Sequence, residues 1–156
     1  MRSLGLLSRS PRHSVTFALT LLTFGTGLCR PARSRIIEFD PSGSYATFPI
    51  GINDSKSITG WYEDSKGNVH GFLRTPDGSI TTFDVEDDGC ATTPFSINRS
   101  GVIVGEEGDS NCNFHGFIRA SDGTITTFDV PDATETEAQS VNNRGLITGI
   151  YHDSSD

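Results

Sequence analysis

The stretch HGFLRTPDGSITTFDV (residues 70–85) decides the fold, because it recurs as HGFIRASDGTITTFDV (residues 115–130). Other residues recur at the same spacing of 44 to 45 residues: the Phe of a Phe-Asp pair, an asparagine and a glycine. They are Phe39, Phe83 and Phe128; Asn53, Asn98 and Asn142; and Gly60, Gly105 and Gly149. A fixed period of this size is typical of a stacked or radial array, in which each unit buries its apolar face against its neighbours.

Each repeat contains four short segments that favour β-strands. In the second unit they lie near 93–98, 102–107, 114–119 and 124–130, and they are rich in β-branched and aromatic residues. Tight-turn sequences between them predict antiparallel hairpins. Four antiparallel strands in about 45 residues make one blade of a β-propeller. We therefore predict an all-β fold of four-stranded antiparallel meander blades in a partial, open β-propeller-like array, with units near 48–85, 93–130 and 138–156, the last one truncated.

Two details of this repeat predict specific contacts. The recurring phenylalanines, including Phe72 and Phe117, are expected to pack between neighbouring blades. Asn53, Asn98 and Asn142 start tight turns that need a left-handed residue three positions later. The second and third units have Gly there, but the first has Lys56. We expect this turn to be strained or differently shaped, at a cost of about 1 kcal/mol.

The first thirty-five residues differ from the repeats. Arg2, Arg9 and Arg12 precede an uncharged apolar stretch over residues 15–29. A positive flank before a short apolar run is the pattern of a secretory signal, and the run is short for a membrane span. We predict a signal peptide over 1–29, a linker over 30–35, a repeat domain over 36–156, and an extracellular or periplasmic location. An uncleaved amino-terminal anchor is the alternative.

Charge is divided unevenly between these segments. All twenty acidic residues lie after Arg35, together with only six of the twelve basic residues, so the repeat region has a net charge of −14. Nucleic acid and anionic lipid surfaces would repel such a domain. We therefore expect neither a nucleic-acid partner nor membrane insertion after signal removal, while glycans, proteins and cations stay open as partners.

The repeat pattern resembles a known family. The order Asn-x-x-Gly, His-Gly-Phe, Asp-Gly and Ile-Thr-Thr-Phe-Asp-Val resembles the extracellular HAF repeat of bacterial secreted proteins, whose name reflects a His-small-Phe triplet. Here that triplet is His70-Gly71-Phe72 and His115-Gly116-Phe117, and the resemblance covers residues 36–156. It implies a secreted, propeller-like array without an assigned activity. Lys56 departs from the pattern, and the third unit stops before its triplet.

About two and a half units are too few to close a ring, because propellers have at least about four blades. We therefore expect a fragment of a longer array. The alternative is an open stack whose exposed edge strands invite partner chains or self-association.

Two cysteines interrupt the repeat. Cys90 lies in the loop that leads into the second unit, and Cys112 lies between that unit's second and third strands. In a meander these loops emerge on the same face, and Cys29 leaves with the signal peptide, so an even pair remains in an oxidising compartment. We predict a disulfide between them that contributes roughly 3 kcal/mol to stability.

Recurring polar and aromatic residues supply the candidate ligand sites. Asp64, Asp109 and Asp153 recur four residues after the repeat glycine, where they could bind calcium or close side-chain turns in solvent. We interpret the recurring His70 and His115 as structural residues, since no nucleophile and no zinc-ligand spacing accompanies them. The aromatic residues near the repeat glycines are candidates for stacking on glycans, although such residues often only complete a core. These are Trp61, Tyr62 and Tyr151.

Taken together, these features predict a secreted, non-enzymatic repeat module that provides a binding or structural surface. The alternatives are a piece of a propeller-type glycan hydrolase or lyase, and an adhesion or assembly module that uses open edge strands. An enzyme needs residues specific to one unit that converge on a pocket, whereas a scaffold repeats the same residues from unit to unit. No cofactor other than calcium is expected.

Overall fold

A computed structural model describes residues 15–16, 36–86 and 89–154. The predicted signal peptide and linker lie outside the described residues, apart from Val15–Thr16, which form strand β1 and pair with β2 (Ile37–Glu38). The described part of the chain consists of strands and turns without a helix, which confirms the all-β prediction. It accordingly holds no helix that could cross a membrane.

Ten further strands form three successive antiparallel units. The first unit contains β3 (Ser44–Ile52), β4 (Ile58–Asp64), β5 (Val69–Arg74) and β6 (Ile80–Phe83). The second contains β7 (Ala91–Ile97), β8 (Ile103–Gly108), β9 (Phe114–Arg119) and β10 (Ile125–Phe128). The third contains β11 (Ala133–Val141) and β12 (Ile147–Asp153). Within each unit, neighbouring strands are consecutive in sequence, so the meander prediction is confirmed.

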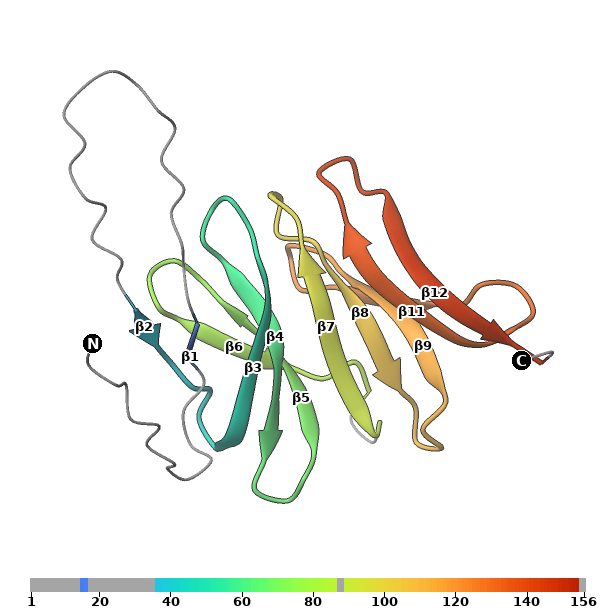
Figure 1. Ribbon diagram of the computed structural model, residues 1–156, viewed down its shortest axis with the longest axis horizontal. Coiled ribbons are helices and arrows are strands. Elements are labelled where there is room, and N and C mark those ends of the chain that lie inside the picture. Colours follow the sequence, from blue (N-terminus) through green and yellow to red (C-terminus); the bar gives the residue numbers. More distant parts are fainter. Residues whose placement is uncertain (1–14, 17–35, 87–88, 155–156) are drawn as a thin grey trace, which may run out of the picture.

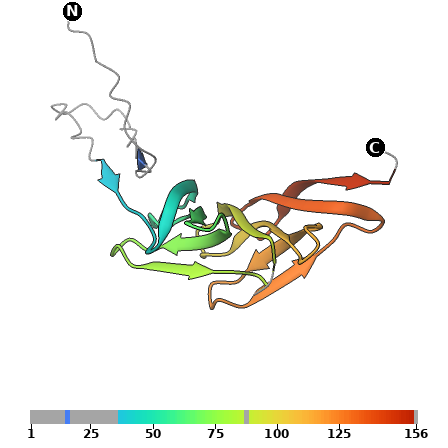
Figure 2. The ribbon, with the colours of Figure 1, turned by 90° about the horizontal axis from the view of Figure 1, so that it is seen from below.

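The three units lie side by side in an open array (Figures 1 and 2). A single parallel bridge between Val69 and Ala91 connects the first two units. The two ends of the array do not meet, so the described strands do not close into a ring. Contact between units therefore depends on side-chain packing more than on a shared strand ladder.

The turns have the predicted geometry. The backbone N–H of Asn98 donates to the carbonyl of Val102 (3.0 Å), and the N–H of Gly101 donates back to Asn98 (3.0 Å). Gly101 has a φ of 84°, and Lys56 has a φ of 68° at the same turn position of the first unit. The turn at Lys56 therefore keeps the shape of the others, with Lys56 itself in the left-handed conformation, and is not differently shaped.

A β-bulge explains the repeat glycine. The first strand of each unit shifts register against the second, in the second unit between Pro94 and Ser96. A side chain on Gly105 would collide there with the carbonyl oxygen of Thr93, so only glycine fits. Proline is tolerated at such a bulge because it interrupts no regular ladder. The first strands also begin earlier than predicted, at Ser44 and Ala133, because a further register shift extends their pairing.

Packing between units explains the recurring phenylalanines. The ring of Phe83 lies against Gly71 of its own unit, where a Cβ would approach the ring to 2.9 Å. The same ring meets Phe117 of the next unit edge-on, with centroids 6.2 Å apart, and Arg119 lies over it at 4.9 Å. Phe39 makes the corresponding edge contact with Phe72 at 5.8 Å. The predicted packing of these aromatic residues between units is confirmed.

A ladder of asparagines joins the turns of successive units. The side-chain amide of Asn53 donates to the backbone carbonyl of Asn98 (2.9 Å), and that of Asn98 donates to Asn142 (3.1 Å). Each side-chain oxygen meanwhile accepts a backbone N–H of its own turn, as from Val102 to Asn98 (3.0 Å). One side chain therefore holds its own turn and the next unit together.

Candidate functional site

The two recurring histidines lie between pairs of carboxylates. His70 on β5 places Nδ1 2.8 Å from Asp84, and its Nε2 lies 3.6 Å from Asp64. His115 on β9 repeats the arrangement, with Nδ1 2.9 Å from Asp129 and Nε2 3.9 Å from Asp109. Asp84 and Asp129 follow the fourth strands, so each histidine links the third and fourth strands of its unit to the loop after the second.

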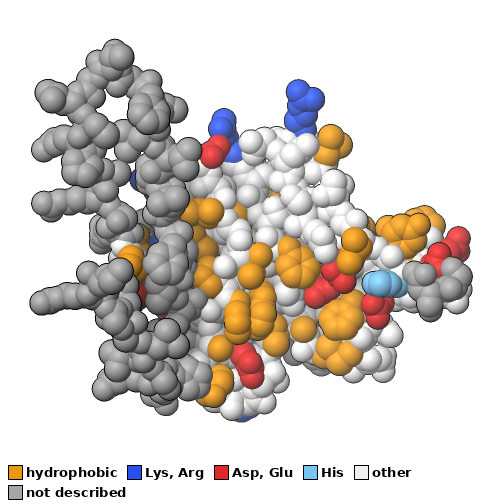
Figure 3. All heavy atoms as spheres, viewed as in Figure 1, with side chains coloured by type: hydrophobic (Ala, Val, Ile, Leu, Met, Phe, Trp, Pro, Cys, Tyr) orange, Lys and Arg blue, Asp and Glu red, His pale blue; other side chains and the backbone are white. Residues whose placement is uncertain are grey.

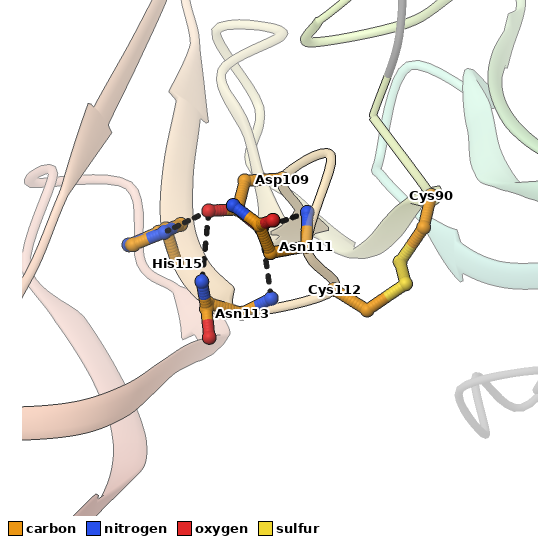
Figure 4. Close-up of a disulfide and its surroundings, with 6 residues drawn as sticks. All are labelled: Cys90, Asp109, Asn111, Cys112, Asn113 and His115. Carbon is orange, nitrogen blue, oxygen red and sulfur yellow. Dashed lines mark hydrogen bonds and ion pairs between the residues drawn. A yellow bond between two sulfur atoms is a disulfide. The ribbon is translucent and has the colours of Figure 1, made fainter.

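Each of the predicted calcium residues in the first two units closes a turn. The Asp109 carboxylate accepts hydrogen bonds from the backbone N–H of Asn111 (2.8 Å) and from the backbone and side chain of Asn113 (both 2.9 Å) (Figure 4). Asp64 accepts the equivalent bonds from Lys66 and Asn68. The bonds from Asn113 lower the pKa of Asp109 to about 2, and the bonds from Asn68 lower that of Asp64 to about 2.

This geometry favours turn closure over metal binding. Asp153, the third member of the set, ends β12 opposite Ala133, and the three carboxylates lie in three different units. Among the residues that the structure describes, no group of three His, Cys, Asp or Glu side chains could hold a metal ion.

The histidine rings are already occupied by these carboxylates. The hydrogen bond that His115 donates to the Asp129 carboxylate raises the pKa of His115, because a carboxylate favours the protonated ring. A general base needs one ring nitrogen directed at a nucleophile or a substrate. With both nitrogens directed at aspartates, this arrangement is suited to bracing strands.

The structure joins Cys90 and Cys112, as predicted. Their Cα atoms lie 5.6 Å apart, within the normal range for a disulfide. Cys112 directly precedes Asn113 of the Asp109 turn, so the disulfide ties this turn to the segment before β7 (Figure 4). A disulfide fits an oxidising compartment.

Glu107 is a buried carboxylate that the sequence did not single out as unusual. It is the equivalent of Tyr62 in the first unit. Tyr62 lies opposite His70 on the neighbouring strand, and Glu107 lies opposite His115 in the same way. Its side chain is 2% exposed, and Oε2 has no hydrogen-bond partner within the described structure. Burial, assisted by the charge of Glu86, raises its pKa. Glu107 lies inside β8, within the segment near 102–107 that was predicted to be a strand, but its burial was not predicted.

A second acidic contact lies between the second and third units. Glu106 on β8 approaches Glu137 and Glu135 on β11, and burial together with these two charges raises its pKa to about 7. All three residues lie in strands. The contact between these units therefore carries electrostatic repulsion that deprotonation increases.

The three aromatic candidates for glycan binding are not brought together. Trp61 on β4 is half-buried and stacks on Phe48 of β3, with ring centroids 3.9 Å apart. Tyr62, its neighbour on β4, is 8% exposed and belongs to the core with Ile58 and Phe72. Tyr151 lies two units away and is 54% exposed. No shared stacking surface results from this arrangement.

Charge is segregated along the strands. The turn ends of the β3–β4, β7–β8 and β11–β12 hairpins lie at the same end of the array, where the basic side chains of this face are visible (Figures 1 and 3). Arg99 forms an ion pair there with Asp54 of the preceding unit, at 2.6 Å. The acidic side chains visible in this view lie mainly toward the middle and the other end.

An apolar groove of about 350 Å³ lies between the second and third units. The second unit contributes Ile118, Phe128 and Val130, and the third contributes Ile147, Gly149 and Tyr151 among others. We call this the β12 groove. The repeat pattern predicts the short third unit, whose two strands form one wall of this groove, but it does not predict the groove.

Some partners of the predicted residues could have been found from the same period. Asp84 and Asp129 each follow their histidine by fourteen residues. Glu107 also stands out when the units are aligned, because the equivalent residues, Tyr62 and Tyr151, are tyrosines. The recurrence of the asparagines predicted their turns. The hydrogen bonds from Asn53 and Asn98 to the next unit could not be predicted, because they depend on the distance between units.

The chain was compared with protein families, curated proteins and solved structures. It matches no family model, no curated protein and no solved structure. The resemblance to the HAF repeat therefore rests on the sequence motifs described above.

Proposed function

We propose that the chain is a secreted, non-enzymatic module of propeller type, related to the HAF-repeat proteins, that serves as a binding or structural surface. One observation carries this proposal: the polar residues that recur are already used to build the units. Each recurring histidine is held between aspartates, and each ladder asparagine bonds its own turn, with Asn53 and Asn98 also reaching the next unit. Four-stranded meanders packed face against face support the propeller assignment.

The disulfide and the amino-terminal sequence support secretion. Production of the full chain in a bacterium with an intact secretory pathway tests this. We expect the exported protein to have lost about the first 29 residues, the predicted signal length, and to show no alkylated cysteine without reductant. Full-length protein retained in the cytoplasm would contradict export.

Enzymatic cleavage of glycans is the competing function. Incubation of the exported protein with a panel of polysaccharides, followed by measurement of new reducing ends, separates the two. We expect no turnover above a sample of denatured protein. Turnover that is lost in His70→Ala or His115→Ala, with the fold retained by circular dichroism, would replace the proposed function with an enzymatic one.

A further inference from the structure

The junction between the first two units contains a buried carboxyl group beside its apolar core. Ile103 on β8 is completely buried in a cluster that includes Phe83 and Val85 of the first unit. Residues four positions apart on a strand lie on the same face, so Glu107 points into the same junction as Ile103. Its side chain is 2% exposed, and Oε2 accepts no hydrogen bond within the described structure.

The charged groups of the described structure that surround Glu107 are mostly acidic. Glu86 acts on it from the segment after β6, Asp109 from the loop after β8, and Asp129 from the segment after β10. His115 lies opposite Glu107 on β9 and is the one cationic group among them. Its ring already lies 2.9 Å from Asp129 and 3.9 Å from Asp109 (Figure 4). Ionisation of Glu107 therefore adds a buried negative charge close to three others.

The other units do not have a carboxyl group at this position. Tyr62 and Tyr151 are the equivalent residues, and Tyr62 belongs to the core of the first unit with Ile58 and Phe72. Burial raises the pKa of Tyr62 above its ordinary value of 10, so that side chain stays neutral at physiological pH. The repeat pattern thus builds this part of a unit without a charge, and Glu107 is an addition to it.

The two ends of the junction are held by different contacts. The asparagine ladder joins the turn ends of the units, with 2.9 Å from the side-chain amide of Asn53 to the carbonyl of Asn98. At the opposite end, the backbone N–H of Val85 donates to the hydroxyl of Thr92 (3.1 Å). Thr92 is the cross-strand neighbour of Glu107 on β7, so this bond crosses the junction next to the buried carboxyl.

We propose that Glu107 makes the junction between the first two units sensitive to pH. With the carboxyl protonated, the junction is closed. When the proton is lost, the Glu107 end opens and admits water to the charge, which breaks the bond between Val85 and Thr92, while the asparagine ladder holds the turn end.

The direction of this response follows from the burial of the group. Burial, assisted by the charge of Glu86, raises the pKa of Glu107 above the ordinary 4.5, so the fold favours the protonated carboxyl. Stability from this group is present below pH 4.5 and is lost as the pH rises through the raised pKa. The junction therefore opens toward higher pH.

Hydrogen exchange at single amides of the full chain tests this opening. Protection factors are measured at pH 4 and pH 8, after correction for the intrinsic pH dependence of exchange. We expect the protection of the Val85 amide to be at least about tenfold lower at pH 8, because a buried carboxylate without a partner is strongly disfavoured. The Val102 amide, which donates to the side chain of Asn98 in the ladder, should keep its protection.

Matched variants identify the group that is responsible. Glu107→Gln keeps the shape of the side chain and does not ionise, so its Val85 amide should be as protected at pH 8 as at pH 4. Glu107→Tyr introduces the residue of the other units and should give the same result, also where the glutamine variant does not fold. Glu106→Gln is the control, because this neighbouring carboxyl faces Glu135 and Glu137 of the third unit and should leave the response at Val85 unchanged.

Three results would overturn the proposal. Equal protection of Val85 at both pH values in the parent chain would mean that the junction does not respond. An equal loss at Val102 would mean that the whole chain unfolds. A response that persists in Glu107→Gln would assign it to another group, first of all His115, whose ring also titrates. The pH response does not depend on what the proposed binding surface binds, so this experiment and the export experiment can fail independently.

Discussion

At the scale of single residues, the left-handed turn positions distinguish the units from one another. Gly101 and Gly145 have φ values of 84° and 79°, while Lys56 holds the same position at 68°. In the turn between the second and third strands, Gly67 of the first unit has a φ of 89°. Cys112 holds the same position in the second unit, with a φ of 58°. A side chain in this conformation costs roughly 1–2 kcal/mol, because its Cβ crowds the following carbonyl. Lys56 and Cys112 therefore occupy positions whose backbone conformation favours glycine.

Replacement of Lys56 by glycine should stabilise the protein. We expect Lys56→Gly to raise the free energy of unfolding by about 1 kcal/mol, since relief of the left-handed strain exceeds the added flexibility of the unfolded chain. Urea denaturation measures the change. Gly101→Lys is the matched control and should destabilise by a similar amount. Equal stability of Lys56→Gly and the parent chain would contradict this account.

The raised pKa of Glu106 predicts a pH dependence. In the folded state its pKa is about 7, above the ordinary 4.5, so the fold favours the protonated carboxyl. Stability from this group is present below pH 4.5 and is lost as the pH rises through 7. Glu106→Gln should therefore stabilise at pH 8 by about 1–2 kcal/mol, roughly half of the full shift because water screens the half-buried group.

Thermal unfolding at two pH values checks this prediction. Glu106→Gln should leave the melting temperature at pH 4 nearly unchanged and raise it at pH 8. Glu38→Gln, on the exposed strand β2, is the control and should change neither. A similar gain at both pH values would mean that the carboxylate charge is not responsible.

At the scale of the elements, the loop between β8 and β9 differs from its equivalent between β4 and β5 by one covalent bond. Both loops close around an aspartate, but only the second bears Cys112 and is joined to Cys90. The disulfide fixes the segment that enters β7 near the single parallel bridge between units. The disulfide therefore supports a junction that one backbone bridge crosses.

Loss of the disulfide should cost roughly 3 kcal/mol of unfolding free energy, because the unfolded chain regains the entropy of a closed loop. Urea denaturation of Cys90→Ser/Cys112→Ser against the oxidised parent measures this. Cys90→Ser/Cys112→Gly separates two effects, since glycine also relieves the left-handed strain at this position. It should be about 1 kcal/mol more stable than the double serine variant.

Calcium should not change the thermal stability of the protein if the loops around Asp64 and Asp109 are closed by their own side-chain hydrogen bonds. Asp64 and Asp109 each already accept three hydrogen bonds, so we expect no shift of the melting temperature at millimolar calcium. A rise that Asp109→Asn abolishes would instead support the calcium interpretation. Magnesium at the same concentration controls for ionic strength.

The elements themselves could be predicted from sequence because turn chemistry and strand composition are local. Asn98 with Gly101 was enough to place a hairpin, and the meander gave the pairing of Cys90 with Cys112. The burial of Glu107 could not be predicted in this way, because it depends on the packing of the first unit against the second. The β12 groove likewise depends on which strands are present on both of its sides.

At the scale of the whole molecule, the asparagine ladder couples the units. Asn98 is 5% exposed and makes one bond to its own turn and one to the next unit. Asn98→Ala should destabilise by about 2 kcal/mol, and Asn98→Asp by about 1 kcal/mol, because aspartate keeps the acceptor and loses the donor. Asn142→Ala is the comparison, since its side chain bonds only its own turn in the described structure.

Chemical denaturation measures the loss of unfolding free energy in each of the three variants. Equal losses for Asn98→Ala and Asn98→Asp would place the whole contribution in the turn and none in the contact between units. A loss in Asn98→Asp larger than in Asn98→Ala would point to charge repulsion at the new carboxylate instead.

The ladder also bears on how such a chain can change its length over evolution. Asn53 and Asn98 have the same two tasks, so an in-frame duplication of one of their repeats would supply a donor for the unit after it and an acceptor for the unit before it. A deletion of one repeat would bring together two turns that already fit each other. Recombination between repeats would thus alter the copy number without requiring a compensating substitution at the new junction.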